Sequence, residues 1–172
     1  MRLFTSACLM AALILASPGC GYRLTGTTSV LPEHVQDFVI MPFDNRTQRP
    51  EIEQRVTEEV SSQLSRRGRY RIVTVVAEAD AVLSGAITAY QTNAVQFSST
   101  GRTTRIEAVV QIQATLRETA SDEILWSQSG LVFRQQFPVP ETGQFFDQES
   151  VALDEIARGA AQALVNSIFE GF

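Results

Sequence analysis

Apolar and polar residues alternate along residues 105–117, and this is the clearest pattern in the chain. A period of two is that of a β-strand, in which successive side chains point to opposite faces of a sheet. Only Val109 departs from the alternation. The segment therefore predicts a strand with one dry face and one wet face. The dry face comprises Ile106, Ala108, Val110, Ile112, Ala114 and Leu116.

A second strand is expected to pair with this one. Residues 119–122 (TASD) supply turn chemistry. Residues 124–137 then return as the antiparallel partner, and Pro138 and Pro140 end it because proline cannot donate to a strand ladder.

Three further strands are expected upstream. Residues 38–41 form a short apolar run stopped by a proline, which is typical of a strand buried on both faces. Residues 44–47 (DNRT) predict a turn. Residues 70–76 are rich in β-branched side chains, and residues 81–97 predict a long strand interrupted at Gly85.

Two helices complete the pattern. Residues 50–67 predict the first, because Pro50 suits the first helical position, glutamates follow it, arginines close it and Gly68 supplies a cap. The last helix is expected after a loop over residues 139–146, with its end at Gly171. Its apolar stripe comprises Leu153, Ile156, Ala157, Ala160, Leu164 and Ile168.

These elements predict an α+β fold in one domain, residues 37–172. The expected architecture is a two-layer sandwich, with two helices packed on one face of a mainly antiparallel four- to five-stranded sheet. The other face of the sheet carries mainly Gln, Thr, Ser and Arg. It is therefore expected to face water or a partner.

The first 19 residues differ from the rest and predict a signal peptide that is removed. One basic residue, a short apolar stretch and small residues at 17–19 are typical of a secretory leader. Residues 15–20 (LASPGC) resemble the lipobox of bacterial lipoproteins, which makes Cys20 the candidate lipid-attachment residue. A buried or disulfide-bonded role for Cys20 is the alternative, but its only possible mate, Cys8, lies inside the leader. Residues 20–36 then form a lipidated tether and lead-in.

The lipid would hold the protein on a membrane without spanning it, because more than one acyl chain gives stable anchoring. Lipoproteins kept in the inner membrane of many Gram-negative bacteria carry Asp after the cysteine. Gly21 stands there in this chain, so the resemblance points to the outer membrane, on its periplasmic side.

Composition narrows the function classes. Hydrophobic residues make up 44% of the 172 residues and charged residues 19%, which favours a folded core over disorder. The formal net charge is −5, and the chain has no run of five or six basic residues. A nucleic-acid partner is therefore not expected.

The residues that enzyme chemistry needs are scarce. His34 is the sole histidine, and a solvated loop role is expected for it rather than a metal or general-base role. No phosphate-binding glycine motif occurs. We therefore expect no catalytic residue, no metal site and no cofactor, and we interpret the protein as a non-enzyme.

The arginines are the candidate binding residues. Arg105, Arg117 and Arg134 fall on the polar phase of their strands, and Arg102 lies at the start of the hairpin. They could line one face and contact lipid phosphates through charge-assisted hydrogen bonds. The alternative is that they only solubilise the wet face and pair with Glu107 or Glu118.

Five segments follow one another in a characteristic order: residues 20–24 (CGYRL), 40–47 (IMPFDNRT), 51–53 (EIE), the hairpin 114–117 (ATLR) to 124–127 (ILWS), and the terminal helix 152–169. This ordered set resembles the LptE family of lipopolysaccharide-assembly lipoproteins.

The resemblance implies a sandwich that plugs the lumen of the outer-membrane β-barrel LptD and binds lipopolysaccharide during its delivery to the cell surface. It also implies basic contacts near the central hairpin, where Arg102 and Arg105 stand, and near the loop before the last helix, where residues 139–146 have no basic residue. Two other functions stay open. One is a general periplasmic scaffold or binding lipoprotein, and the other is an envelope hydrolase, which the missing catalytic constellation disfavours.

Overall fold

A computed structural model describes residues 31–139 and 145–170 of the chain. The predicted signal peptide, Cys20 and most of the predicted tether lie outside the described residues, as do Gly171 and most of the loop before the last helix. The described part contains no helix that is long and apolar enough to cross a membrane.

The described strands form one six-stranded sheet. Its main path runs β3–β1–β4–β5–β6, and the short β2 pairs with β4 beside that path. The bounds are Asp37–Ile40 (β1), Asp44–Asn45 (β2), Arg71–Ile72 (β3), Ala81–Phe97 (β4), Thr103–Glu118 (β5) and Ile124–Pro138 (β6).

The expected α+β class is confirmed, and the longest strand pairings are antiparallel as predicted, but the sheet is mixed and has six strands rather than four to five. β4, β5 and β6 are antiparallel, whereas β1 pairs in parallel with both β3 and β4, and β2 pairs in parallel with β4. The helix between β2 and β3 makes this possible, because a crossover returns the chain to the same end of the sheet and so gives a parallel neighbour. The sheet is therefore mixed.

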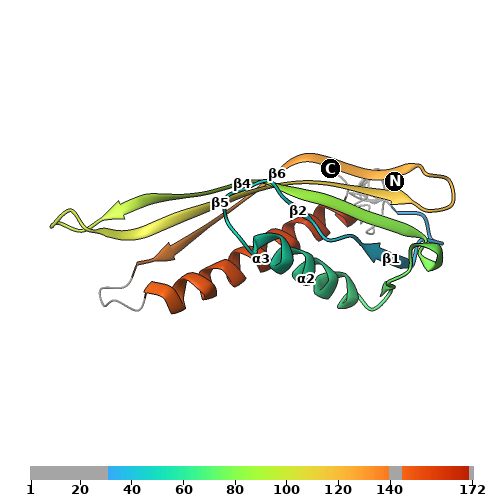
Figure 1. Ribbon diagram of the computed structural model, residues 1–172, viewed down its shortest axis with the longest axis horizontal. Helices are drawn as coiled ribbons and strands as arrows, with labels where there is room; N and C mark the ends of the chain where they lie inside the picture. Colours follow the sequence, from blue (N-terminus) through green and yellow to red (C-terminus); the bar gives the residue numbers. More distant parts are fainter. Residues whose placement is uncertain (1–30, 140–144, 171–172) are drawn as a thin grey trace, which may run out of the picture.

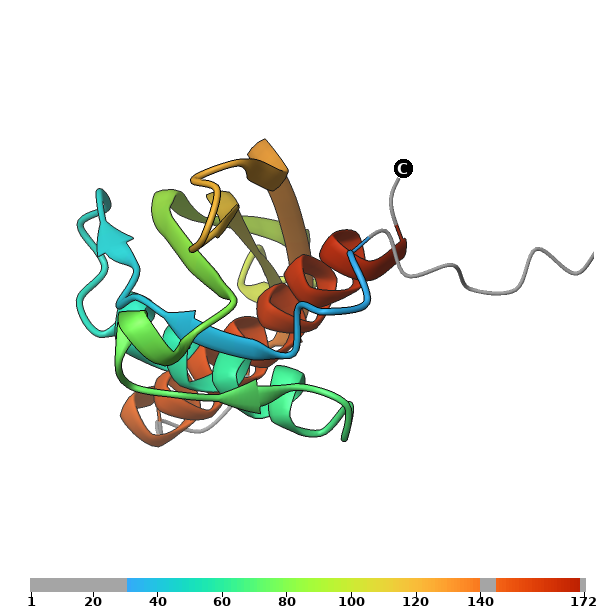
Figure 2. The ribbon, with the colours of Figure 1, turned by 90° about the vertical axis from the view of Figure 1, so that its right-hand side faces the viewer.

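Both helices pack against one face of the sheet, as predicted (Figures 1 and 2). They are α2, Ile52–Ser65, and α3, Phe145–Glu170. The stripe of α2 is fully buried, and so are the apolar positions of α3 that point to the sheet and to α2. Buried residues of these stripes are Ile52, Val56, Val60, Leu64, Leu153, Ile156, Leu164 and Ile168.

The first helix begins later than predicted. Pro50 lies outside α2, and Glu51 caps the helix with a φ of 68°. The helix also ends two residues earlier than predicted, at Ser65, and Gly68 then follows with a φ of 67°. The turn prediction for residues 44–47 holds in part. Asp44 and Asn45 form β2, and the Asn45 side chain then accepts the Thr47 N–H at 2.9 Å.

The strand expected over residues 70–76 is mostly absent. Only β3 forms, and a short 3₁₀-helix follows at Val76–Glu78. Tyr70 is buried instead, with its ring stacked on Phe169 at 4.8 Å and edge-on to Phe38 at 5.3 Å. Packing between aromatic rings, rather than strand propensity, therefore fixes this segment.

The predicted interruption at Gly85 is also wrong, because β4 runs unbroken through it. A Cβ atom at this position would lie 2.5 Å from the Phe43 ring and 2.6 Å from the Gln113 carbonyl oxygen. Gly85 therefore provides space for the buried Phe43 to pack on the strand. The alternation along β5 is confirmed, with Ala108, Val110, Ile112, Ala114 and Leu116 all buried.

Candidate binding face of the sheet

The side of β4, β5 and β6 that faces away from the helices is the main candidate site, and we call it the polar face. The register puts the odd-numbered residues of β5 on it, together with their partners on both sides. Its side chains include Gln91, Asn93, Glu107, Gln111, Gln113, Thr115, Ser127, Arg134 and Gln136. Neither described helix covers this face (Figure 2). Its amides, hydroxyls and arginines are thus free to meet water or a partner.

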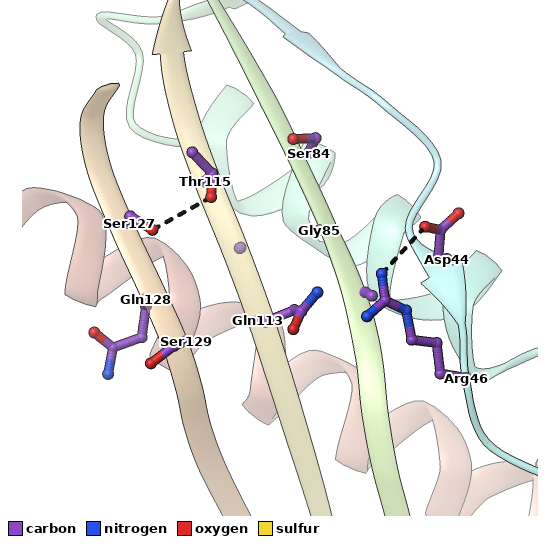
Figure 3. A pocket seen from close by; sticks show the side chains of 11 residues that line it. Asp44, Arg46, Ser84, Gly85, Gln113, Thr115, Ser127, Gln128 and Ser129 are labelled. Atoms are coloured by element: carbon purple, nitrogen blue, oxygen red, sulfur yellow. Dashed lines mark hydrogen bonds and ion pairs between the residues drawn. The ribbon is translucent and has the colours of Figure 1, made fainter. Parts of the chain in front are cut away.

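A hollow of about 390 Å³ opens on the polar face where the side chains are small. Ser84, Thr115, Ser127 and Ser129 come from three neighbouring strands and form its floor (Figure 3). Thr115 and Ser127 share a hydrogen bond of 3.3 Å between their hydroxyl oxygens.

One wall of the hollow comes from β2 and the residue that follows it. Asp44 and Arg46 stand there with 4.0 Å between their charged groups, and both side chains are more than half exposed (Figure 3). Because β2 lies alongside β4, these two charges face the hydroxyl-rich floor. The hollow therefore offers hydrogen bonds to hydroxyl or carbonyl groups and one cation at its rim.

Two of the predicted arginines lie together at the β4–β5 hairpin. Arg105 is exposed near the start of β5, and its Nε donates to Gln96 Oε1 across the hairpin at 3.3 Å. Arg102 is exposed in the connecting turn, where its backbone N–H donates to Ser98 Oγ at 3.1 Å. This hairpin projects beyond the helices (Figure 1). The structure thus presents both residues at a protruding tip.

The other two predicted arginines are separate from that tip. Arg134 is exposed on the polar face of β6, opposite Val109. Arg117 lies at the far end of β5, where it contacts Asp122 through an ion pair of 3.3 Å. Twelve residues of extended strand put Arg117 about 40 Å from Arg105. Three of the arginines lie on the polar face and Arg102 lies in the hairpin turn, so the four do not form one site.

The predicted partners of these arginines make other contacts. Glu107 accepts a hydrogen bond from Gln136 at 3.3 Å. Glu118 accepts from Ser121 and from His34 Nε2, the latter at 2.6 Å. These hydrogen bonds, that of Ser121 first and that of His34 second, hold the pKa of Glu118 below its ordinary value. The His34 side chain is 65% exposed, as expected, and its hydrogen bond to Glu118 ties the lead-in to the end of β5.

A second cluster of arginines, at positions 66–69, follows α2. Arg67 donates to Asn166 Oδ1 at 2.6 Å and lies 4.5 Å above the Phe169 ring. These contacts fasten the end of α2 to α3. They support a packing role for Arg67 rather than a role in ligand binding.

Sequence reasoning did not find the hollow. Asp44 and Arg46 read as turn residues, and the hydroxyl residues Ser84, Thr115, Ser127 and Ser129 are spread over three different strands. The phase of each strand could have shown that these small polar residues point to the polar face. Only the register between the strands shows that they lie side by side. Among the residues that the structure describes, no group of three acidic, histidine or cysteine side chains could hold a metal ion.

Comparisons with known proteins agree with this architecture. A search of curated proteins gives no match. Among solved structures, an uncharacterized lipoprotein B from Nitrosomonas europaea is similar, with a TM-score of 0.55 and 17% identity over 87% of this chain and 90% of the other. A minor lipoprotein from Acinetobacter baumannii has a TM-score of 0.50 and 10% identity over 78% of this chain and 92% of the other. These likenesses show the fold.

The family model described as "LptE: Lipopolysaccharide-assembly" matches residues 35–168. The match spans more than half of the chain, from β1 to the last turns of α3. The chain therefore belongs to the LptE family of lipopolysaccharide assembly.

Proposed function

We propose that this protein plugs and supports an LptD-type β-barrel in the outer membrane and binds lipopolysaccharide during its delivery to the cell surface. Family membership supports a general role in lipopolysaccharide assembly. The observation that carries the finer proposal is the polar face, a long three-stranded surface of amides, hydroxyls and arginines that the two helices leave uncovered. Large outer-membrane barrels have a polar interior, so such a surface suits a plug within one.

The barrel partner is tested by isolating the full-length protein from native membranes in mild detergent and identifying what comes with it. An LptD-type barrel recovered in near-stoichiometric amount supports the plug. Recovery of a different envelope protein, with no barrel, would support a general periplasmic scaffold instead. A helix-face variant that keeps the polar face intact, Glu58→Gln, serves as the control for nonspecific loss, because Glu58 is exposed on the outer side of α2.

Lipopolysaccharide binding is assigned to the hairpin tip, where Arg102 and Arg105 lie together and exposed. A charge-assisted hydrogen bond to a phosphate contributes about 1.5–3 kcal/mol, so each lost contact should weaken binding by about tenfold or more. The double variant Arg102→Ala/Arg105→Ala should therefore bind purified lipopolysaccharide much more weakly. It should also melt nearly as the wild type does, because both residues are exposed.

The matched control removes two arginines at the other end of the molecule, Arg66→Ala/Arg69→Ala. Arg67 is left in place because it fastens α2 to α3. Equal losses in both double variants at low salt, with equal recovery at high salt, would indicate diffuse attraction alone and would end the hairpin assignment.

Attachment to the membrane is assigned to lipid on Cys20. The leader pattern supports it, and a diacylated or triacylated cysteine gives stable anchoring. Cys20→Ala should abolish incorporation of labelled palmitate and release the protein from outer-membrane fractions. The domain should still fold, because the buried core that the structure describes, from Leu31 to Phe169, lies downstream of Cys20. Palmitate on the Cys20→Ala protein would rule out this attachment site.

A further inference from the structure

The two edges of the sheet are very different. At one edge, β3 has only two residues, and Arg71 in it binds Asp37 of β1 through two hydrogen bonds of 2.7 and 2.6 Å. At the other edge, β6 has 15 residues and, within the described part of the chain, pairs with β5 alone. A very short edge strand resists unwanted pairing, whereas a long one exposes a row of free backbone donors and acceptors.

The directions of these backbone groups follow from one hydrogen bond. The Val139 N–H donates to the Thr104 carbonyl oxygen at 2.9 Å, so the backbone of Val139 points toward β5. In an antiparallel pair the residues alternate between pointing inward and outward. The register is unbroken from Leu131 to Pro138. The N–H and C=O groups of Val132, Arg134 and Gln136 therefore point away from β5, toward the open side.

Little in this stretch protects the edge. Natural edge strands carry lysines, prolines, bulges or inward-pointing charges that prevent pairing. Residues 131–137 hold a single charge, Arg134, and the nearest irregularity in β6 lies before Leu131. The backbone of Pro138 also points away from β5, but this proline lies at the last position of the strand. Among the described residues, the edge from Leu131 to Phe137 is thus an open template for strand pairing.

The edge is also held rigidly in place. The Phe133 ring packs under β6 against α3, so closely that a Cβ atom on Gly159 would lie 2.2 Å from its Cζ. Phe137 is buried farther along the same side of the strand. A strand that is ordered before binding loses little conformational entropy when a partner adds to it.

We propose that residues 132–136 of β6 receive an extended segment of the barrel partner by β-strand addition. This inference rests on the proposed function, because it takes the barrel as the occupant. Backbone hydrogen bonds supply the affinity in this mode of binding, and alternate side chains supply the specificity. On the polar side the segment meets Val132, Arg134 and Gln136, so charge complementarity calls for an acidic residue opposite Arg134 and an uncharged one opposite Val132.

A second copy of this chain fits the edge poorly. An antiparallel pair of β6 strands centred on the template would set Arg134 opposite Arg134, and like charges directly opposite one another are destabilising. Each copy also carries a net charge of −5.

The test removes outward N–H groups without touching the β5–β6 ladder. Val132→Pro and Gln136→Pro each delete one outward donor, and native Pro138 shows that this phase of the strand accepts proline. Two lost hydrogen bonds should lower barrel retention in the double variant by about tenfold. The matched control Val132→Thr/Gln136→Thr changes the same two side chains but keeps both N–H groups, so the proline variant should retain about tenfold less barrel than this control does.

Hydrogen exchange on the unmodified proteins gives an independent measurement that does not depend on the folding of a variant. The amides of Val132, Arg134 and Gln136 should exchange rapidly in the isolated protein and at least about tenfold more slowly in the barrel complex. A photo-crosslinker at position 136 should link to the barrel.

Several results would overturn the inference. They are equal barrel retention by the proline and threonine variants, unchanged exchange at the three amides in the complex, or a crosslink to a second copy or to residues 20–30 of the same chain. Failure of the wild-type protein to retain any barrel would instead reject the proposed function itself, so the two failures are distinguishable.

Discussion

Replacement of Gly159 by alanine tests the packing of α3 under the sheet. Gly159 lies in the interior of a 26-residue helix, where glycine is a poor choice. A Cβ atom there would lie 2.2, 2.8 and 2.9 Å from three atoms at the far end of the Phe133 ring. Glycine is therefore needed at this position because a side chain would clash with the Phe133 ring. Gly159→Ala has two opposing effects, a gain in helix propensity and a clash with this ring.

The relative magnitudes of these two effects decide whether Gly159→Ala raises or lowers the free energy of unfolding. Alanine in a helix interior is more favourable than glycine by about 1 kcal/mol. Forcing extra volume into a packed contact costs about 1–3 kcal/mol. Because the ring atoms lie well inside van der Waals distance, we take the upper part of that range. Gly159→Ala should then lower the free energy of unfolding by about 1–2 kcal/mol, which is a fall of roughly 2–8 °C in Tm for a domain of this size.

The assay is a double-mutant cycle with Phe133→Leu, followed by urea and thermal unfolding of the four proteins. Leucine lacks the Cε and Cζ atoms that the new methyl group would meet. In that background only the helix propensity remains, so Gly159→Ala should become stabilising by about 1 kcal/mol. The sign reversal corresponds to a coupling free energy of about 2–3 kcal/mol, which is the size expected for residues in direct contact.

Additive behaviour would refute this reasoning. If Gly159→Ala stabilises the wild type and the Phe133→Leu protein by the same amount, the ring does not limit the space at position 159. The inference that packing of Phe133 against α3 holds β6 rigidly in place would then be contradicted as well.

Two further predictions follow from the strand phases and the Glu118 contacts. Leu116→Ala removes a fully buried side chain and should lower the free energy of unfolding by about 2–5 kcal/mol, whereas Gln113→Ala on the polar face should change it by no more than about 0.5 kcal/mol. Equal losses of the two variants in urea unfolding would contradict the assigned strand phase. The lowered pKa of Glu118 means that its contribution to stability is present above the ordinary glutamate pKa of about 4.3 and is lost as the pH falls through the lower folded-state value. The difference in Tm between the wild type and Glu118→Gln should therefore narrow as the pH is lowered below the ordinary glutamate pKa, and a difference that stays constant there would contradict the assigned cause.

Elements with a long, regular pattern could be predicted from the sequence. The period of two predicted β5 and its dry face, and the long strand over residues 81–97 matches β4 at both ends. The short strands could not be predicted in the same way, because β2 and β3 have two residues each and two residues show no period. Their parallel pairing depends on which strand becomes the neighbour, and that choice is made by tertiary packing.

The candidate site was predictable only as a face. Strand phase correctly placed Arg105, Arg117 and Arg134 on the polar side, but phase carries no information about distance along the strand. The number of residues between Arg105 and Arg117 on the same strand supplies that distance instead. It shows that the two arginines cannot share a ligand site of ordinary size. The hollow also required the register of three strands and the position of Asp44 beside them.

The central claim is that the polar face lies against the interior of an LptD-type barrel, and crosslinking in living cells tests it most directly. A photo-crosslinking residue is placed at Gln91, which is exposed on the polar face of β4, and in a separate protein at Glu58, which is exposed on the outer side of α2. The account predicts a strong adduct with the barrel from position 91, of higher yield than that from position 58. An adduct from position 91 with a different envelope protein, or no barrel adduct from it while the barrel crosslinks at position 58, would contradict the claim.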